Sequence, residues 1–308
     1  MLDMLTNISK VFFLYSARLV LPYLPLKVIY FLGDILGYMM VGGKKELIRK
    51  EVILLLGCES KHKQDRIIRR YVQNVRKNLL EIWTFSKLNR KKINNMIYLE
   101  GNKHLDKALS KGKGAILCVT HLGSHKIVIP AMGYNGYKVN QVAANPQVFV
   151  RKEKAFYHNK IMKLELESES FIPARFIYVK ENKSVRPIYR ALKENEIVLI
   201  SLDGVIETER LTVPFLNSNI SLATGAALLS FHTGAPAFPI FPIRQKDNRH
   251  KIIIHEPIEI QNMSLKEDYI KEWVLSFAYL FQGYVKNYPD HYIGWIASIK
   301  NDNYKMIS

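Results

Sequence analysis

The sequence predicts an α/β protein with a central mixed, largely parallel sheet flanked by helices, and a helical, membrane-associated N-terminal region. Three observations predict this class. Short apolar runs alternate with segments of helical period from residue 97 onward. Residues 11–40 are almost entirely apolar. A chain of 308 residues with 48% hydrophobic residues is also long and apolar enough to bury a large core.

The apolar segment 11–40 comes first, and it is a poor candidate for a membrane-spanning helix. Its uncharged runs fall short of the roughly 20 residues needed to cross a bilayer. The charges that interrupt it are Arg18, Lys27 and Asp34. Pro22 and Pro25 divide it into two short helices, and no small-residue cleavage site marks it as a secretory signal. We expect an interfacial membrane anchor over residues 11–40, with a buried helical hairpin as the alternative.

Two further helices are predicted between residues 44 and 85, with a break at 57–63, because apolar residues recur there at helical spacing. Their polar faces are basic, in a chain with 45 Lys and Arg against 27 Asp and Glu and a formal net charge of +18. Such an excess favours an anionic partner. The basic residues are dispersed and no nucleic-acid motif is present, so nucleic acid is set aside in favour of an anionic membrane surface or an acidic protein.

The remaining chain alternates strands with helices. Strands are expected at 97–101, 115–119, 139–143, 176–179, 197–202, 237–243 and 251–255. Helices are expected at 104–110, 154–166, 184–193, 223–231 and 265–285, and a turn at 130–136. This alternation favours a sheet that is parallel at least in part. We divide the chain into a helical N-terminal region, 1–87, and an α/β domain, 88–308.

The stretch ILCVTHLGSHK, residues 116–126, carries the candidate chemistry. It places His121 directly after a buried strand, where a neutral imidazole could act as a general base. Gly123 and Ser124 follow in a turn and could offer backbone N–H groups to an oxyanion. The only cysteines, Cys58 and Cys118, form no CxxC pair, so we expect neither a disulfide framework nor a structural zinc site.

Four stretches, in this order, carry a family resemblance. They are Glu100-Gly101 with Leu105 and KGKG leading into ILCVTHLG, LKENEIVLISLDG at 192–204, VPFLNSNISLATGAALLSFHTGAPAFPIFPIR at 213–244, and YPDHYIGW at 288–295. Together they resemble the late acyltransferases of lipid A biosynthesis, within the lysophospholipid acyltransferase superfamily. The resemblance runs from about residue 11 to residue 300.

This resemblance implies transfer of a fatty acyl chain from acyl carrier protein to a hydroxyl of a lipid acceptor, with His121 as general base. It also implies a peripheral position on the cytoplasmic face of the bacterial inner membrane. Acyl carrier proteins are acidic, so a basic surface would attract them. No metal or cofactor is implied beyond the acyl thioester itself.

The chain departs from the family pattern at several positions. The family places a carboxylate five residues after the histidine, where this chain has Lys126, and a cation cannot accept the imidazole N–H. Asn145 stands in place of the arginine of an Arg-Pro pair. Asp203-Gly204 replaces an Asp-Gln or Asp-His pair, and the segment that starts at Trp295 replaces a His-Arg-Arg cluster. These changes remove groups that would bind a phosphorylated acceptor.

Three outcomes are compatible with these departures. His121 could act alone or with another acceptor for its N–H, such as Asp203, on an alcohol or amine substrate. His125 could take over, with Lys126 turned to solvent or to an anionic substrate group. Alternatively, the protein could be a silent relative that binds acyl carrier protein or lipid. Hydrolysis of the thioester by water is a further possibility.

Five more residues are candidates for binding the donor or the acceptor: Asn145, Arg175, Gly204, Thr224 and Gly225. Three of them also have a purely structural interpretation. Thr224 and Gly225 could cap and pack a helix, Arg175 could belong to a solvated face, and Asp203 itself could cap a turn.

Overall fold

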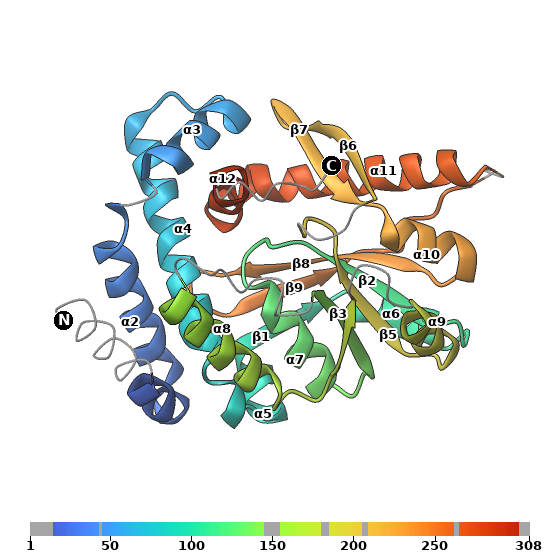
Figure 1. Cartoon of the computed structure of the whole chain (residues 1–308), viewed down its shortest axis with the longest axis horizontal. Helices are drawn as coiled ribbons and strands as arrows, with labels where there is room; N and C mark the ends of the chain where they lie inside the picture. Colours follow the sequence, from blue (N-terminus) through green and yellow to red (C-terminus); the bar gives the residue numbers. More distant parts are fainter. Residues whose placement is uncertain are drawn as a thin grey trace.

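The structure is a computed structural model that describes residues 15–42, 45–144, 155–179, 185–204, 209–261 and 265–301. Within these residues a seven-stranded sheet runs in the order β1-β9-β8-β2-β5-β3-β4, with a separate two-stranded sheet, β6-β7. Helices lie on both sides of the large sheet (Figure 1). All its neighbouring pairs are parallel except β8 with β9. The predicted mixed, largely parallel α/β fold is confirmed.

The strands are β1 Ile97–Glu100, β2 Ala115–Val119, β3 Val139–Ala144, β4 Arg175–Val179, β5 Ile197–Ser201, β6 Arg210–Phe215, β7 Ser218–Ala223, β8 Ala237–Arg244 and β9 His250–Ile254. The helices are α2 Leu26–Met39, α3 Lys45–Leu56, α4 Lys61–Ile82, α5 Arg90–Met96, α6 Asn102–Leu109, α7 Val128–Tyr134, α8 Ala155–Glu169, α9 Arg186–Lys193, α10 Gly225–Thr233, α11 Lys266–Asn287 and α12 Ile293–Asn301. Short 3-10 turns are η1 Leu21–Tyr23, η3 Phe85–Lys87, η4 His125–Ile127 and η6 Pro289–His291.

The sheet separates two apolar layers, because side chains alternate between the faces of a strand. In β2, Ile116 and Cys118 join the cluster formed with α3, α9, α10, α11 and α12. Leu117 and Val119 join the cluster formed with α2, α5, α6, α7 and α8. Every residue of β2 is buried. The helix α4 contributes to both clusters and closes one end of the sheet (Figure 1).

The N-terminal helix α2 packs along α4 through two glycines. A Cβ atom added at Gly33 or Gly37 would collide with Lys77 or Gln73 of α4, so only glycine permits this close approach. The predicted break at the prolines is confirmed, since η1 carries Pro22 and α2 begins after Pro25. In the part of the chain that the structure describes, no helix has both the length and the apolar character required to cross a membrane.

One local prediction is wrong, and one element was missed. Residues 130–136 do not form an isolated turn, because α7 covers most of them, and Pro130 fits in its first turn, where a backbone N–H has no intrahelical partner. The hairpin of β6 and β7 was not predicted. Its strands carry polar residues such as Thr212, Asn219 and Ser221 and therefore lack a strong apolar signal.

Candidate active site

Sheet register brings His121 and Asp203 together. The last residue of β2, Val119, pairs with the last residue of β5, Ser201. His121 and Asp203 each lie two residues beyond this pair, at the carboxyl end of the parallel strands. Ligands and catalytic groups in open α/β sheets collect at this edge. Two residues that are 82 positions apart in the chain thus become neighbours.

Asp203 is the hydrogen-bond acceptor for the imidazole of His121. The distance from His121 Nδ1 to Asp203 Oδ1 is 2.8 Å. The backbone N–H of His121 also donates to the same carboxylate, at 2.9 Å from Oδ2 and 3.1 Å from Oδ1. A neutral imidazole that donates from Nδ1 keeps Nε2 as an unprotonated acceptor, which is the atom that a general base needs. The side chain of His121 remains 21% exposed, whereas that of Asp203 is 3% exposed.

The surroundings of Asp203 favour its ionised form. Burial by itself raises the pKa of this carboxyl, but the charge and the two N–H groups of His121 outweigh burial and lower that pKa below its usual value. Ser201 Oγ donates to Oδ1 at 3.1 Å, and the hydroxyl of Tyr292 also bonds to the carboxylate. Burial and the adjacent Asp203 raise the pKa of Tyr292 well above its usual value, so Tyr292 remains a donor.

Two rings contact the imidazole of His121. The indole of Trp295 is stacked on it, with ring centroids 3.8 Å apart and planes 12° from parallel. The ring of His125 is tilted against it at 4.5 Å and 57°. Burial, followed by the nearby His121 and Lys126, lowers the pKa of His125 well below its usual value, which keeps His125 neutral at pH 7. The orienting carboxylate belongs to His121, so the geometry favours His121 over His125 as the base.

Lys126 points to α8 and not to the imidazole of His121. Its ammonium lies 2.8 Å from Glu165 Oε2 and 2.6 Å from Glu169 Oε1. Burial lowers the pKa of Lys126, but the two carboxylates outweigh it and raise that pKa above its usual range. The lysine at the family's carboxylate position therefore stabilises the packing of α8 against the turn.

Gly123 cannot supply the oxyanion N–H that the sequence suggested. Its backbone N–H donates to the carbonyl oxygen of His291 at 2.9 Å. Gly123 is a turn residue, with φ +60°, and an added Cβ would collide with the carbonyl oxygen of Pro242. Its own carbonyl accepts from Asn78 Nδ2 at 3.0 Å. Ser124 is buried, and its hydroxyl donates to Glu81 Oε2 at 3.1 Å.

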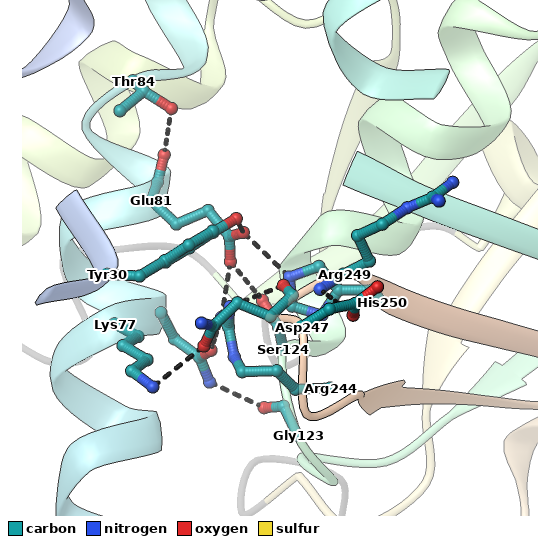
Figure 2. Close-up of polar contacts among 12 residues, drawn as sticks. Tyr30, Lys77, Glu81, Thr84, Gly123, Ser124, Arg244, Asp247, Arg249 and His250 are labelled. Atoms are coloured by element: carbon teal, nitrogen blue, oxygen red, sulfur yellow. Dashed lines mark hydrogen bonds and ion pairs between the residues drawn. The ribbon is translucent and has the colours of Figure 1, made fainter. Parts of the chain in front are cut away.

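A buried carboxylate, Glu81 of α4, joins this turn to the sheet (Figure 2). Arg244 Nη2 donates to Oε2 at 2.9 Å, and His250 Nε2 and the Tyr30 hydroxyl reach Oε1 at 2.8 Å and 2.7 Å. Burial raises the pKa of Glu81, but Arg244, His250 and Tyr30 outweigh it and hold that pKa far below its usual value. We call these four side chains, together with Ser124, the Glu81 network. It links α2, α4, β8, β9 and the turn after His121.

The other predicted residues are placed differently. Thr224 lies close to the site, because the preceding Ala223 donates its N–H to the carbonyl of Leu202. Gly204 accepts a hydrogen bond from Arg210, and a Cβ at Gly225 would meet open space. Arg175 is not brought to the site. It is the first residue of β4 and therefore lies at the amino ends of the parallel strands, whereas His121 and Asp203 follow the carboxyl ends. Asn145 lies outside the described residues.

An open groove lies at the amino ends of β2 and β8 and is not part of the site. Its lining includes Lys113, which precedes β2, and Pro236, which precedes β8. The length of β2, about 16 Å, separates it from His121. In the described ranges no group of three or more His, Cys, Asp or Glu side chains is arranged to hold a metal ion.

Sequence reasoning missed three contributors to the site. Trp295 was noticed only as a departure from a family pattern, and Tyr292 only as part of the YPDHYIGW stretch. Glu81 lies in a helix predicted from its apolar spacing. A carboxylate next to Leu79, Leu80 and Ile82 was the available signal for a buried acid.

The fold and the site define an α/β protein in which a buried carboxylate orients a histidine at the carboxyl ends of the parallel strands. The family model for bacterial lipid A biosynthesis acyltransferases matches residues 3–297, nearly the whole chain. The chain belongs to this family of acyltransferases, which act in membrane-associated lipid biosynthesis. A comparison with curated proteins gives no match.

Proposed function

We propose that the protein transfers a fatty acyl chain from an acyl thioester on acyl carrier protein to the hydroxyl or amine of a lipid-like or small acceptor. His121 is the general base and Asp203 its orienting carboxylate. The 2.8 Å contact between His121 Nδ1 and Asp203 Oδ1 carries the proposal, because it supplies the carboxylate that the motif lacks at Lys126. Family membership supports acyl transfer as the reaction class.

The reaction follows from the geometry of this pair. Nε2 of His121 takes the proton of the acceptor as the acceptor oxygen or nitrogen forms a bond to the thioester carbonyl carbon. Asp203 stabilises the imidazolium that results. When the tetrahedral intermediate collapses, the carbon–sulfur bond breaks and the imidazolium returns the proton to the leaving thiolate. No other group is required for the proton balance.

Intact-mass measurement of acyl carrier protein loaded with mixed chain lengths, incubated with a cell lipid extract, tests the proposal. We expect loss of the acyl mass with the native protein and its abolition in His121→Ala. Asp203→Asn should reduce the rate by about two to four orders of magnitude, since an amide cannot stabilise the imidazolium. His232→Ala, at an exposed histidine on α10, is the matched control and should keep the native rate.

Each other outcome has a definite meaning. Release of free fatty acid without any acceptor would identify a thioesterase. Binding of the carrier protein without loss of the acyl mass, for every chain length, would refute His121 as a base and favour the silent relative. Equal rates for the native protein and Asp203→Asn would refute Asp203 as the orienting group.

We further propose that the N-terminal helices lie on the cytoplasmic face of the bacterial inner membrane. The support is a set of exposed apolar side chains, here called the α2 patch: Leu19, Val20, Tyr23, Phe31, Ile35, Tyr38, Met39 and Met40. Phe31, Ile35 and Tyr38 share one face of α2, opposite its buried residues. Arg69 and Lys87 hold cations over the rings of Tyr38 and Tyr23, where anionic headgroups would meet them.

A further inference from the structure

The indole of Trp295 lies flat on the imidazole of His121. The centroid distance of 3.8 Å and the angle of 12° describe a close, nearly parallel stack. Asp203 occupies the Nδ1 edge of the same imidazole. The imidazole is therefore fixed by a hydrogen bond at one edge and by an aromatic ring on one face.

Segment 292–295 supplies two of the groups around the base. Tyr292 bonds to Asp203 through its hydroxyl, and Trp295, in the first turn of α12, stacks on His121. Gly294 packs so closely against Tyr71 of α4 that any side chain there would collide with that ring. The close packing against α4 sets the position of the indole.

The face of the indole, and not its N–H, makes this contact. Trp295 Nε1 is buried and has no hydrogen-bond partner in the described part of the chain. Aromatic faces attract cations, and indole does so most strongly among side chains. A general base passes through its cationic form during the reaction, so a stacked indole favours the transition state over the resting state.

We propose that Trp295 is a positioning residue that holds the plane of His121 and stabilises its imidazolium form during acyl transfer. This inference rests on the proposed role of His121 as base. Trp295 contacts the face of the imidazole, whereas Asp203 occupies its Nδ1 edge, so the proposed effect of Trp295 acts through the imidazole.

Several other groups influence the protonation of His121. Asp203 and its partner Tyr292 face the Nδ1 edge, and His125 lies against the ring. Lys126 is neutralised by the two carboxylates of α8. Since Trp295 carries no charge, its replacement removes none of these electrostatic neighbours. A variant that keeps an aromatic face is needed to separate the stack from the greater exposure of the imidazole to water.

Two substitutions of Trp295 distinguish the effect of its aromatic face on His121 from the effects of its N–H group and of its volume. Trp295→Phe keeps a face without an N–H, and Trp295→Leu removes the face. Ile296→Ala, on the same helix, is the control for lost packing in α12. Protonation of His121 is followed by NMR of ¹³C-labelled histidine, with His121→Ala to assign the signal, and thermal unfolding checks that each variant folds.

In Trp295→Leu we expect the protonation midpoint of His121 to move to lower pH by about 0.5–1 unit, because the cation loses its aromatic partner. The acidic limb of the rate profile should move with it, and kcat should fall about tenfold with little change in KM. Trp295→Phe should recover most of both effects, and Ile296→Ala should show neither.

An unchanged midpoint in a folded Trp295→Leu protein would overturn the proposal. Equal effects of Leu and Phe would overturn the role of the aromatic face. The NMR midpoint is independent of turnover, so failure of acyl transfer in the native protein would refute the proposed function without deciding the effect of the stack.

Discussion

At the scale of single residues, the imidazole of His121 contacts the carboxylate of Asp203, which follows a different strand, and not the side chain of Lys126. The sequence predicted His121 and included Asp203 among its possible partners. The sequence alone could not identify the partner of the His121 imidazole. That partner depends on the pairing of Val119 with Ser201, which sequence periodicity does not specify. Neither the oxyanion role expected of Gly123 nor a site role for Arg175 agrees with the structure, and both depend on tertiary contacts.

The placement of Lys126 leads to a prediction about restoring the motif. Lys126→Glu restores a carboxylate at the position where the family has one, but the new carboxylate would face Glu165 and Glu169 of α8. We expect no gain in acyl transfer. The free energy of unfolding should fall by about 2–4 kcal/mol, because a partly buried ion pair is replaced by repulsion among three carboxylates. Urea denaturation and the intact-mass assay measure the two quantities.

Lys126→Met is the companion variant, since it keeps the aliphatic stem and removes the charge. It should retain acyl transfer and lose less stability than Lys126→Glu. A higher turnover in Lys126→Glu would show that position 126 reaches the imidazole after all and that Asp203 is not its natural partner.

At the scale of elements, the sequence predicted the buried strands of the sheet well, because continuous apolar runs such as β2 and β5 have few alternatives. It failed where local signals conflict with tertiary packing. Pro130 indicated a turn but occupies the first turn of α7, and the polar β6–β7 hairpin is stabilised by its packing against α11. The contacts of α4 with the turn after His121 could not be predicted from the sequence, because Asn78 and Glu81 contact residues far along the chain.

The Glu81 network should be essential for the stability of this turn. In Glu81→Gln, the buried guanidinium of Arg244, whose side chain is 3% exposed, loses its counter-charge. We expect the free energy of unfolding to fall by about 3–5 kcal/mol, the usual cost of breaking a buried ion pair. Urea denaturation measures the loss, and Glu59→Gln, at an exposed acid just before α4, should change it by no more than about 0.5 kcal/mol.

A double variant tests the same interpretation. Glu81→Gln leaves the charge of Arg244 unpaired. The double variant Glu81→Gln/Arg244→Gln should therefore lose less free energy of unfolding than the sum of the losses in the two single variants. Strict additivity would mean that the ion pair contributes no coupling and that the loss comes from packing alone.

At the scale of the whole molecule, the second half of α4 connects the lipid-facing and catalytic parts that we propose. Lys77 and Gln73 hold α2 at the seam of Gly33 and Gly37, and Glu81, in the last turn of α4, holds the loop after His121. Tyr30, on the inner face of α2, reaches the same carboxylate. Two buried side chains, Tyr30 and Glu81, thus connect α2 to Ser124 in the turn after His121.

The α2 patch gives the prediction at this scale. The double variant Phe31→Ser/Tyr38→Ser replaces two side chains that are 63% and 67% exposed, so it should leave the fold intact. If these rings enter a bilayer, their loss should weaken binding to vesicles of mixed zwitterionic and anionic phospholipid at least about tenfold, since each buried ring contributes on the order of 1 kcal/mol. Tyr279→Ser removes an aromatic ring that is 78% exposed on α11 and should bind as the native protein does. Flotation of vesicles with bound protein measures all three.

Two outcomes would contradict this prediction. Equal binding by the double variant and the native protein would place the lipid contact elsewhere. A native protein that does not bind vesicles, but self-associates through these residues in light scattering, would show that the α2 patch is a protein interface.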